Sequence, residues 1–181
     1  MLRKLLLFLL IYILFGFTQD SGHFFPEIQC GTLDGKTMSF PTSLRGKYSI
    51  LGFSMSNQAE ESLKTWFKPV FYSFIYKPKK EVLFRTSYDV NLYFVSMYSE
   101  SNNSGYSKAK AKYNVGLDKK LKPYILMFQG DMKSIQRKLA ANSCSVPYIF
   151  LLNQKGEIVY QTQGNFSESK MMKIEDILDG F

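Results

Sequence analysis

Residues 145–160, with the sequence SVPYIFLLNQKGEIVY, decide the fold of this chain. Two runs of aromatic, aliphatic and β-branched residues flank an Asn-Gln-Lys-Gly turn, and this pattern predicts an antiparallel β-hairpin. A helix is predicted to follow over 167–179, with Ser167 as its N-cap and Met171 and Ile174 on its inner face. The last part of the chain is therefore predicted to be a hairpin followed by a helix.

The residues before this stretch predict alternating strands and helices. A hairpin is expected over 25–40, turning at Asp34-Gly35, and strands are expected over 48–53, 90–97 and 124–128. Apolar residues at helical spacing over 63–75 predict a helix, which Asn57 should cap with Glu60 as reciprocal partner and which Pro69 should kink. A short helix capped by Asp131 is expected over 131–141. The order predicts one α/β domain, a central mixed β-sheet flanked by helices with an N-terminal β-hairpin extension.

The first 18 residues are predicted to be a signal peptide, and 19–181 to be the single mature domain. Arg3 and Lys4 precede an unbroken apolar run over 5–15, and small residues stand before Gln19. The run is shorter than the about 20 apolar residues that span a bilayer, which favours cleavage near Thr18 or Gln19 over an uncleaved membrane tether. A mitochondrial transit peptide would be amphipathic and rich in Arg and Ser, whereas this segment is apolar on every side. We expect a protein exported to a bacterial periplasm or secreted, with no stable membrane insertion after cleavage.

Cleavage would lower the formal charge from +8 to +6, so the mature domain stays basic. Six lysines crowd the segment 101–123, where nucleic acid or anionic headgroups are conceivable partners. We favour a solvated surface and no nucleic acid, because the lysines form no groove motif and arginine is absent among them. The lysines are Lys108, Lys110, Lys112, Lys119, Lys120 and Lys122.

The layout over 25–179 resembles the thioredoxin-like superfamily. The most specific part is Val146-Pro147 followed by an apolar strand, a Gly turn, a second strand and a terminal helix, and the resemblance implies that Pro147 is cis. Within that superfamily, Ser54-Met55-Ser56 and the later segment over 65–71, TWFKPVF, are similar to mitochondrial ATP-synthase assembly factors, which carry a Trp and a Pro-aromatic pair on the first helix.

The thiols that such redoxins use are missing from their usual place. Dithiol exchange needs a thiolate at the start of the first helix, and here that position holds Ser56-Asn57-Gln58-Ala59. Cys30 and Cys144 are the two cysteines, and three states remain open for them: two free or buried thiols, a structural disulfide, or an atypical redox pair. His23 is the only histidine, so no metal site and no cofactor are predicted, and serine-hydrolase, P-loop and zinc-protease motifs are absent.

The sequence therefore predicts a redox-inactive thioredoxin-like domain that acts by binding a protein or peptide, as an envelope assembly or maturation factor. The predicted binding residues are Ser56, Asn57 and Gln58 at a helix start, where backbone donors can hold an anion or a peptide carboxylate, with Val146 and Pro147 opposite. In a second interpretation these residues only close the helix end. The alternative function is a thiol-disulfide oxidoreductase that uses Cys144 with Cys30.

Overall fold

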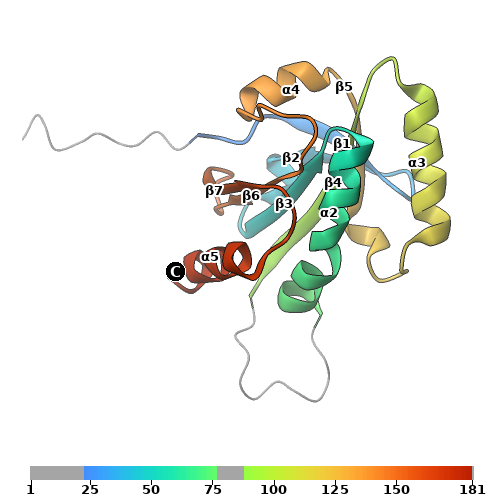
Figure 1. Ribbon diagram of the computed structural model, residues 1–181. Helices are drawn as coiled ribbons and strands as arrows, with labels where there is room; N and C mark the ends of the chain where they lie inside the picture. The colour runs from blue at the N-terminus through green and yellow to red at the C-terminus, as the bar shows by residue number, and fades with distance from the viewer. Residues whose placement is uncertain (1–22, 77–87, 181) are drawn as a thin grey trace, which may run out of the picture.

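A seven-stranded mixed β-sheet forms the centre of the computed structural model, which describes residues 23–76 and 88–180 (Figure 1). The strands are β1 (Ile28–Thr32), β2 (Thr37–Phe40), β3 (Tyr48–Ser54), β4 (Val90–Ser99), β5 (Ile125–Gly130), β6 (Tyr148–Leu152) and β7 (Ile158–Gln163). Their order across the sheet is β2-β1-β5-β4-β3-β6-β7. β4 pairs in parallel with β3 and β5, and the outer pairs are antiparallel. The predicted mixed sheet and both predicted hairpins, β1–β2 and β6–β7, are confirmed.

Helices cover both faces of this sheet. They are α2 (Asn57–Val70), α3 (Asn103–Gly116), α4 (Met132–Lys138) and α5 (Glu168–Asp179), with short helical turns over Thr42–Leu44, Phe71–Ile75 and Lys122–Tyr124. Trp66 of α2 and Met171 of α5 share one core with Phe94 of β4, whereas Ile135 of α4 shares the other core with Val95 of β4. The alternation predicted for the strand over 90–97 is therefore confirmed, because a strand points successive side chains to opposite faces.

The start of α2 differs by one residue from the prediction. Ser56 is the N-cap, in an extended conformation, and its Oγ accepts a hydrogen bond from the Ala59 N–H at 3.1 Å. Asn57 is already the first helical residue, so the prediction that it caps the helix is wrong. Glu60 is not its reciprocal partner, because the Glu60 side chain is buried and accepts a hydrogen bond from the Tyr98 hydroxyl. The apolar stripe that follows, by contrast, runs along α2 as predicted.

The prediction of a cis bond before Pro147 is wrong. Within the described residues, the cis peptide bond is Phe40-Pro41. Pro147 directly precedes β6: its carbonyl accepts a hydrogen bond from Gly164 N at 2.9 Å, and Tyr148 is paired with Gln163 of β7. Both contacts form with a trans bond before Pro147, and trans is the lower-energy isomer of a bond before proline by about 0.5–1 kcal/mol.

Three further segments add detail to the sequence-based expectations. The lysine-rich segment contains the regular helix α3, capped by the Asn102 side chain. Pro69 lies inside α2, which passes into a π-helical turn from Phe71, a kind of irregularity that proline and other helix defects produce. His23, near the start of the described residues, contacts the Lys138 carbonyl at 2.8 Å through Nε2.

The predicted signal peptide lies outside the described residues. None of the described helices is long and apolar enough to cross a bilayer.

Candidate functional site

The predicted site lies where the chain leaves β3 and enters α2. Ser56 joins this helix start to the segment before β6, because its Oγ donates a hydrogen bond to the Cys144 carbonyl at 2.7 Å while it accepts from Ala59 N. Val146 and Pro147 were predicted to lie opposite the helix start, and the contact of Ser56 with Cys144 brings the segment just before them to it. Ser56, Asn57 and Gln58 are exposed, whereas Val146 is half-buried and Pro147 is buried.

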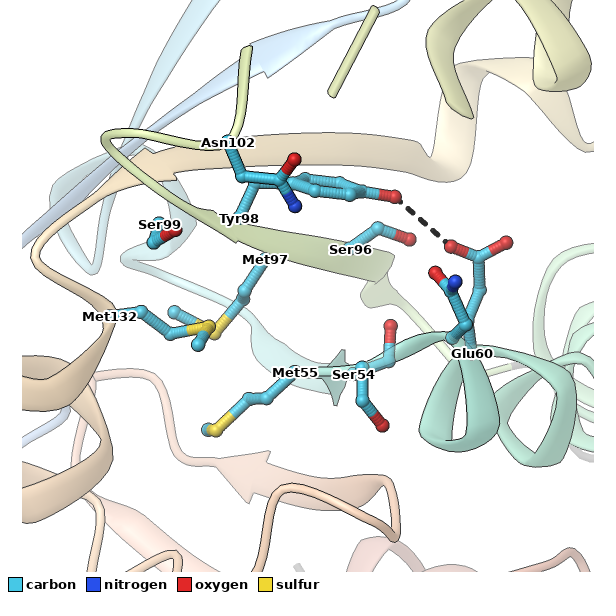
Figure 2. Close-up of a pocket in the computed structure, with 11 residues that line it drawn as sticks. Ser54, Met55, Glu60, Ser96, Met97, Tyr98, Ser99, Asn102 and Met132 are labelled. Atoms are coloured by element: carbon cyan, nitrogen blue, oxygen red, sulfur yellow. Dashed lines mark hydrogen bonds between the residues drawn. The ribbon is translucent and has the colours of Figure 1, made fainter. Parts of the chain in front are cut away.

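A pocket of about 90 Å³ opens next to Ser56, at the ends of β3 and β4. We call it the α2 pocket (Figure 2). The carboxyl ends of parallel strands are where ligand sites of open α/β sheets usually lie. Its lining residues are Ser54, Met55, Ser56, Asn57, Glu60, Ser96, Met97, Tyr98, Ser99, Asn102 and Met132.

Glu60 is the charged residue among the pocket-lining side chains, and it is only 6% exposed. Its carboxylate accepts a hydrogen bond from the Tyr98 hydroxyl at 3.1 Å and lies 3.4 Å from Lys64 Nζ. Burial raises the pKa of the Tyr98 hydroxyl well above its usual value, and the charge of Glu60 is the second cause of this rise. Tyr98 therefore stays protonated and acts as a donor to the carboxylate.

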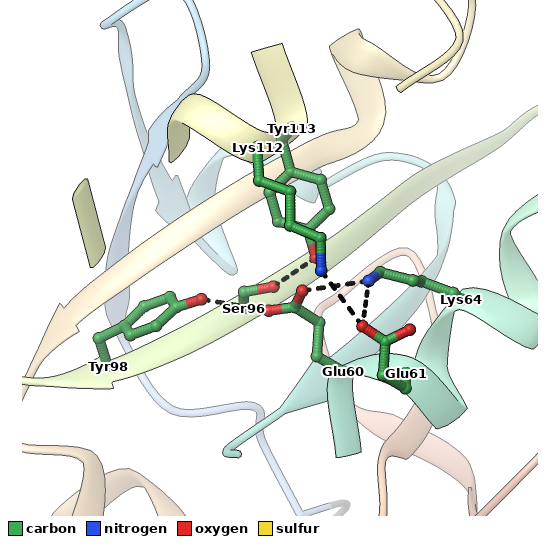
Figure 3. A network of polar contacts seen from close by, with 7 residues as sticks. All are labelled: Glu60, Glu61, Lys64, Ser96, Tyr98, Lys112 and Tyr113. Atoms are coloured by element: carbon green, nitrogen blue, oxygen red, sulfur yellow. Dashed lines mark hydrogen bonds and ion pairs between the residues drawn. The ribbon is translucent and has the colours of Figure 1, made fainter. Parts of the chain in front are cut away.

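Two neighbouring contacts extend this network (Figure 3). The Ser96 and Tyr113 hydroxyls are 3.0 Å apart, and burial is the main cause that raises the pKa of Tyr113. On the outer side of α2, Lys64 lies 2.6 Å and Lys112 lies 3.3 Å from Glu61 Oε1. The hydrogen bond from Lys64 is the main cause that lowers the pKa of Glu61. The ion pair of Lys112 with Glu61 connects α3 to α2.

A shallow groove of about 360 Å³ runs between α2 and α3. It shares Asn57, Glu60 and Tyr98 with the α2 pocket, so the two hollows adjoin at the start of α2. Lys108 and Lys112 of α3 line its other side. The groove is open, and the small α2 pocket adjoins it at the start of α2, a form that suits an extended chain with one inserted side chain.

Neither cysteine is part of a disulfide. Cys30 and Cys144 are both free thiols, Cys30 fully buried on β1 and Cys144 half-buried before β6. Burial raises the pKa of Cys30 to about 12, which opposes formation of the reactive thiolate. In the part of the chain that the structure describes, no three His, Cys, Asp or Glu side chains are grouped to hold a metal ion.

The structure brings together only part of the predicted residue set. Ser56 and Asn57 line the α2 pocket, whereas Gln58, Val146 and Pro147 do not. Sequence reasoning missed Ser54, Glu60, Ser96 and Tyr98. One signal was available for Glu60: it stands three residues before Leu63, so it extends the inward-facing stripe of the helix by one turn.

The fold and this helix start define a thioredoxin-like domain with a serine in place of the first helix-start thiol. Solved structures with the same fold include the exposed lipoprotein thioredoxin Etrx1 of Streptococcus pneumoniae, at 17% identity and a TM-score of 0.54 over 84% of this chain and 100% of that one. A putative thiol:disulfide interchange protein DsbE of Chlorobium tepidum is 14% identical, with a TM-score of 0.55 over 88% of this chain and 96% of that one. BsSco, a member of the Sco family of cytochrome c oxidase assembly proteins, is 13% identical, with a TM-score of 0.55 over 88% of this chain and 94% of that one.

The chain belongs to the ATP10 protein family, whose model matches residues 15–179. This confirms the resemblance to ATP-synthase assembly factors that was drawn from the residues around Ser54 and Trp66. A comparison with curated protein sequences gave no match.

Proposed function

We propose that this protein is an assembly factor for a membrane-bound ATP synthase and acts by binding a polypeptide of that complex, without thiol-disulfide exchange. Membership of the ATP10 family supports the assembly role. The observation that carries the absence of thiol chemistry is Ser56. Its hydroxyl stands where a dithiol redoxin needs a thiolate and is engaged with the Cys144 carbonyl at 2.7 Å.

The geometry at the start of α2 supports polypeptide binding. Asn57 and Gln58 are exposed beside the Ser56 cap, and the groove between α2 and α3 leads away from them toward Lys108. Exposed polar groups at a helix start can hydrogen-bond to an extended chain, and an open groove accepts it without rearrangement of the core. The bound segment would lie over the first turn of α2.

Photo-crosslinking in the native cell tests this proposal. A photoreactive amino acid placed at Gln58 is expected to crosslink to an ATP-synthase subunit or to its assembly intermediate. The same group at Lys173, which is exposed on α5, is the matched control and is expected to give no such product. Equal crosslinking from both positions, or none from Gln58 to any ATP-synthase polypeptide, would overturn the proposed site.

We also propose that the segment 1–18 is a signal peptide that directs export of the domain, to a bacterial periplasm or out of the cell, and is then removed. The basic start and the short apolar run support this. Mass measurement of the mature chain is expected to find a new N-terminus near Gln19. An intact Met1 on the mature protein would contradict cleavage and support the alternative, a domain tethered by its N-terminal segment.

A further inference from the structure

The α2 pocket has two chemically different sides. Figure 2 shows the Ser54, Ser96 and Glu60 oxygens on one side and the thioethers of Met97 and Met132 on the other. The three polar residues are deeply buried, whereas the rim residues Ser56, Asn57 and Asn102 are exposed. A side chain that enters from the rim therefore has thioethers on one side and buried oxygen atoms on the other.

Ser54 Oγ is an unusual atom in this pocket. It is buried and has no hydrogen-bond partner among the residues that the structure describes. Most buried polar side-chain atoms in proteins are hydrogen-bonded, and one that is not calls for an explanation. Because the atom lines the α2 pocket, a ligand there can reach it.

The charge of Glu60 is only partly compensated by the protein. Lys64 Nζ lies 3.4 Å from Glu60 Oε1 but 2.6 Å from the carboxylate of Glu61, so it is bound more closely by its outer neighbour. Tyr98 donates one hydrogen bond to Glu60 Oε2, and the Tyr113 hydroxyl also interacts with this carboxylate. A carboxylate has about four acceptor sites, so capacity for further donors remains, and buried charges are normally paired.

We propose that the α2 pocket binds a lysine side chain of the partner polypeptide. A lysine ammonium carries three donors on a flexible four-carbon stem, and the pocket offers a carboxylate and hydroxyl oxygens on one side and thioethers on the other. The negative charge of Glu60 repels Asp and Glu, and a wholly aliphatic side chain would leave Ser54 unpartnered. That the lysine belongs to an ATP-synthase polypeptide rests on the proposed function.

Methionine-methyl NMR of the purified protein tests the pocket directly, with n-butylammonium chloride as the probe. We expect saturable shifts of the Met55 and Met97 methyl resonances, assigned by replacing each residue with Leu. n-Butanol and sodium butyrate are the matched uncharged and anionic probes and are expected to bind at least about tenfold more weakly, because only the ammonium pairs with Glu60.

Two variants connect this binding to the proposed groups. Glu60→Gln is expected to weaken butylammonium binding about tenfold, since the charge-assisted bond is lost, and Ser54→Ala to weaken it about threefold, since a neutral hydrogen bond is lost. Ser54→Ala removes an unpartnered hydroxyl, so it should leave the fold intact. Glu168→Gln makes the same charge change on exposed α5 and should leave the affinity unchanged.

Three results would overturn the inference: no shift at Met55 and Met97, equal responses to butylammonium and butanol, or undiminished binding in both pocket variants. This failure is distinguishable from failure of the proposed function. If the pocket does not bind butylammonium, a crosslink from Gln58 to an ATP-synthase subunit would still support the proposed function. If that crosslink is absent, butylammonium binding would still support an ammonium site in the pocket.

Discussion

Ser56 stabilises the start of α2 through two hydrogen bonds, one accepted from Ala59 N and one donated to the Cys144 carbonyl. Ser56→Ala removes both, and we expect it to lower the free energy of unfolding by about 1–2 kcal/mol, the usual cost of losing an N-cap. Asn57→Ala is the control, because Asn57 is exposed and does not cap the helix. It should change stability by less than about 0.5 kcal/mol.

Urea denaturation of the two variants measures this difference. If Asn57→Ala were the more damaging of the two, the sequence-based assignment of the cap would be right and the structural one wrong. The pair also separates a structural from a binding role for Asn57, since Asn57→Ala is expected to leave the fold unchanged.

Cys30 is expected to be inert to alkylation in the folded protein. Its side chain is fully buried, and burial raises its pKa to about 12, so very little thiolate is present near pH 8. Iodoacetamide at pH 8 should add one label to the native protein, at half-buried Cys144, and two after unfolding. Two labels on the native protein at comparable rates, read by intact mass, would contradict the burial of Cys30.

The same pKa shift gives a pH dependence of stability. The folded-state pKa of Cys30 lies above the ordinary value of 9.0, so the protonated thiol favours the folded state. Its contribution is complete below about pH 9 and is lost as the pH rises toward 12. Between pH 8 and 10.5, the native chain should therefore lose more stability than Cys30→Ala, which lacks the group. Parallel stability curves for the two proteins would refute this.

At the scale of elements, β3 and α2 are packed closely at Gly52. A Cβ atom there would lie 2.8 Å from side-chain carbons of Leu63 and Phe94 and 3.2 Å from one of Ile149, all fully buried. Gly52→Ala is expected to lower the free energy of unfolding by about 1–3 kcal/mol, the usual cost of overpacking. Thermal and urea unfolding measure it.

Gly116 provides the matched control for that prediction. It ends α3, and a Cβ there would meet no atom within 4 Å. Gly116→Ala should be neutral or stabilising by up to about 1 kcal/mol, because alanine restricts the unfolded chain. Equal losses at both positions would show that the packing between β3 and α2 is not the cause.

The elements with strong local patterns were predictable from sequence. Alternation over 90–97 and the turn at 153–156 predicted β4 and the β6–β7 hairpin, because burial of one face and turn chemistry are local properties. The cap of α2 and the isomer of Pro147 were not, because tertiary contacts decide them: Ser56 meets Cys144 across 88 residues of sequence. The α2 pocket was missed for the same reason, since β3, β4 and α2 each supply a part.

At the scale of the molecule, long-range contacts connect the start of the described domain to β7 and the segment before the last helix to α2. The His23 carbonyl accepts a hydrogen bond from Ile158 N of β7, and Trp66 Nε1 of α2 donates to the Gly164 carbonyl before α5 at 2.9 Å. The chain thus forms a complete thioredoxin-like sheet, although the start of α2 contains no cysteine. This arrangement favours a role for the fold as a rigid support for the surface around Ser56.

The central claim is that this support binds a partner and does no thiol chemistry. Replacing Cys30 with Ala and Cys144 with Ser in the producing cell tests it most directly, with assembled ATP synthase measured by native electrophoresis and folding of the variant checked by circular dichroism. The account predicts assembly at the level of the native protein. A folded, normally abundant cysteine-free variant that fails to support assembly would contradict it.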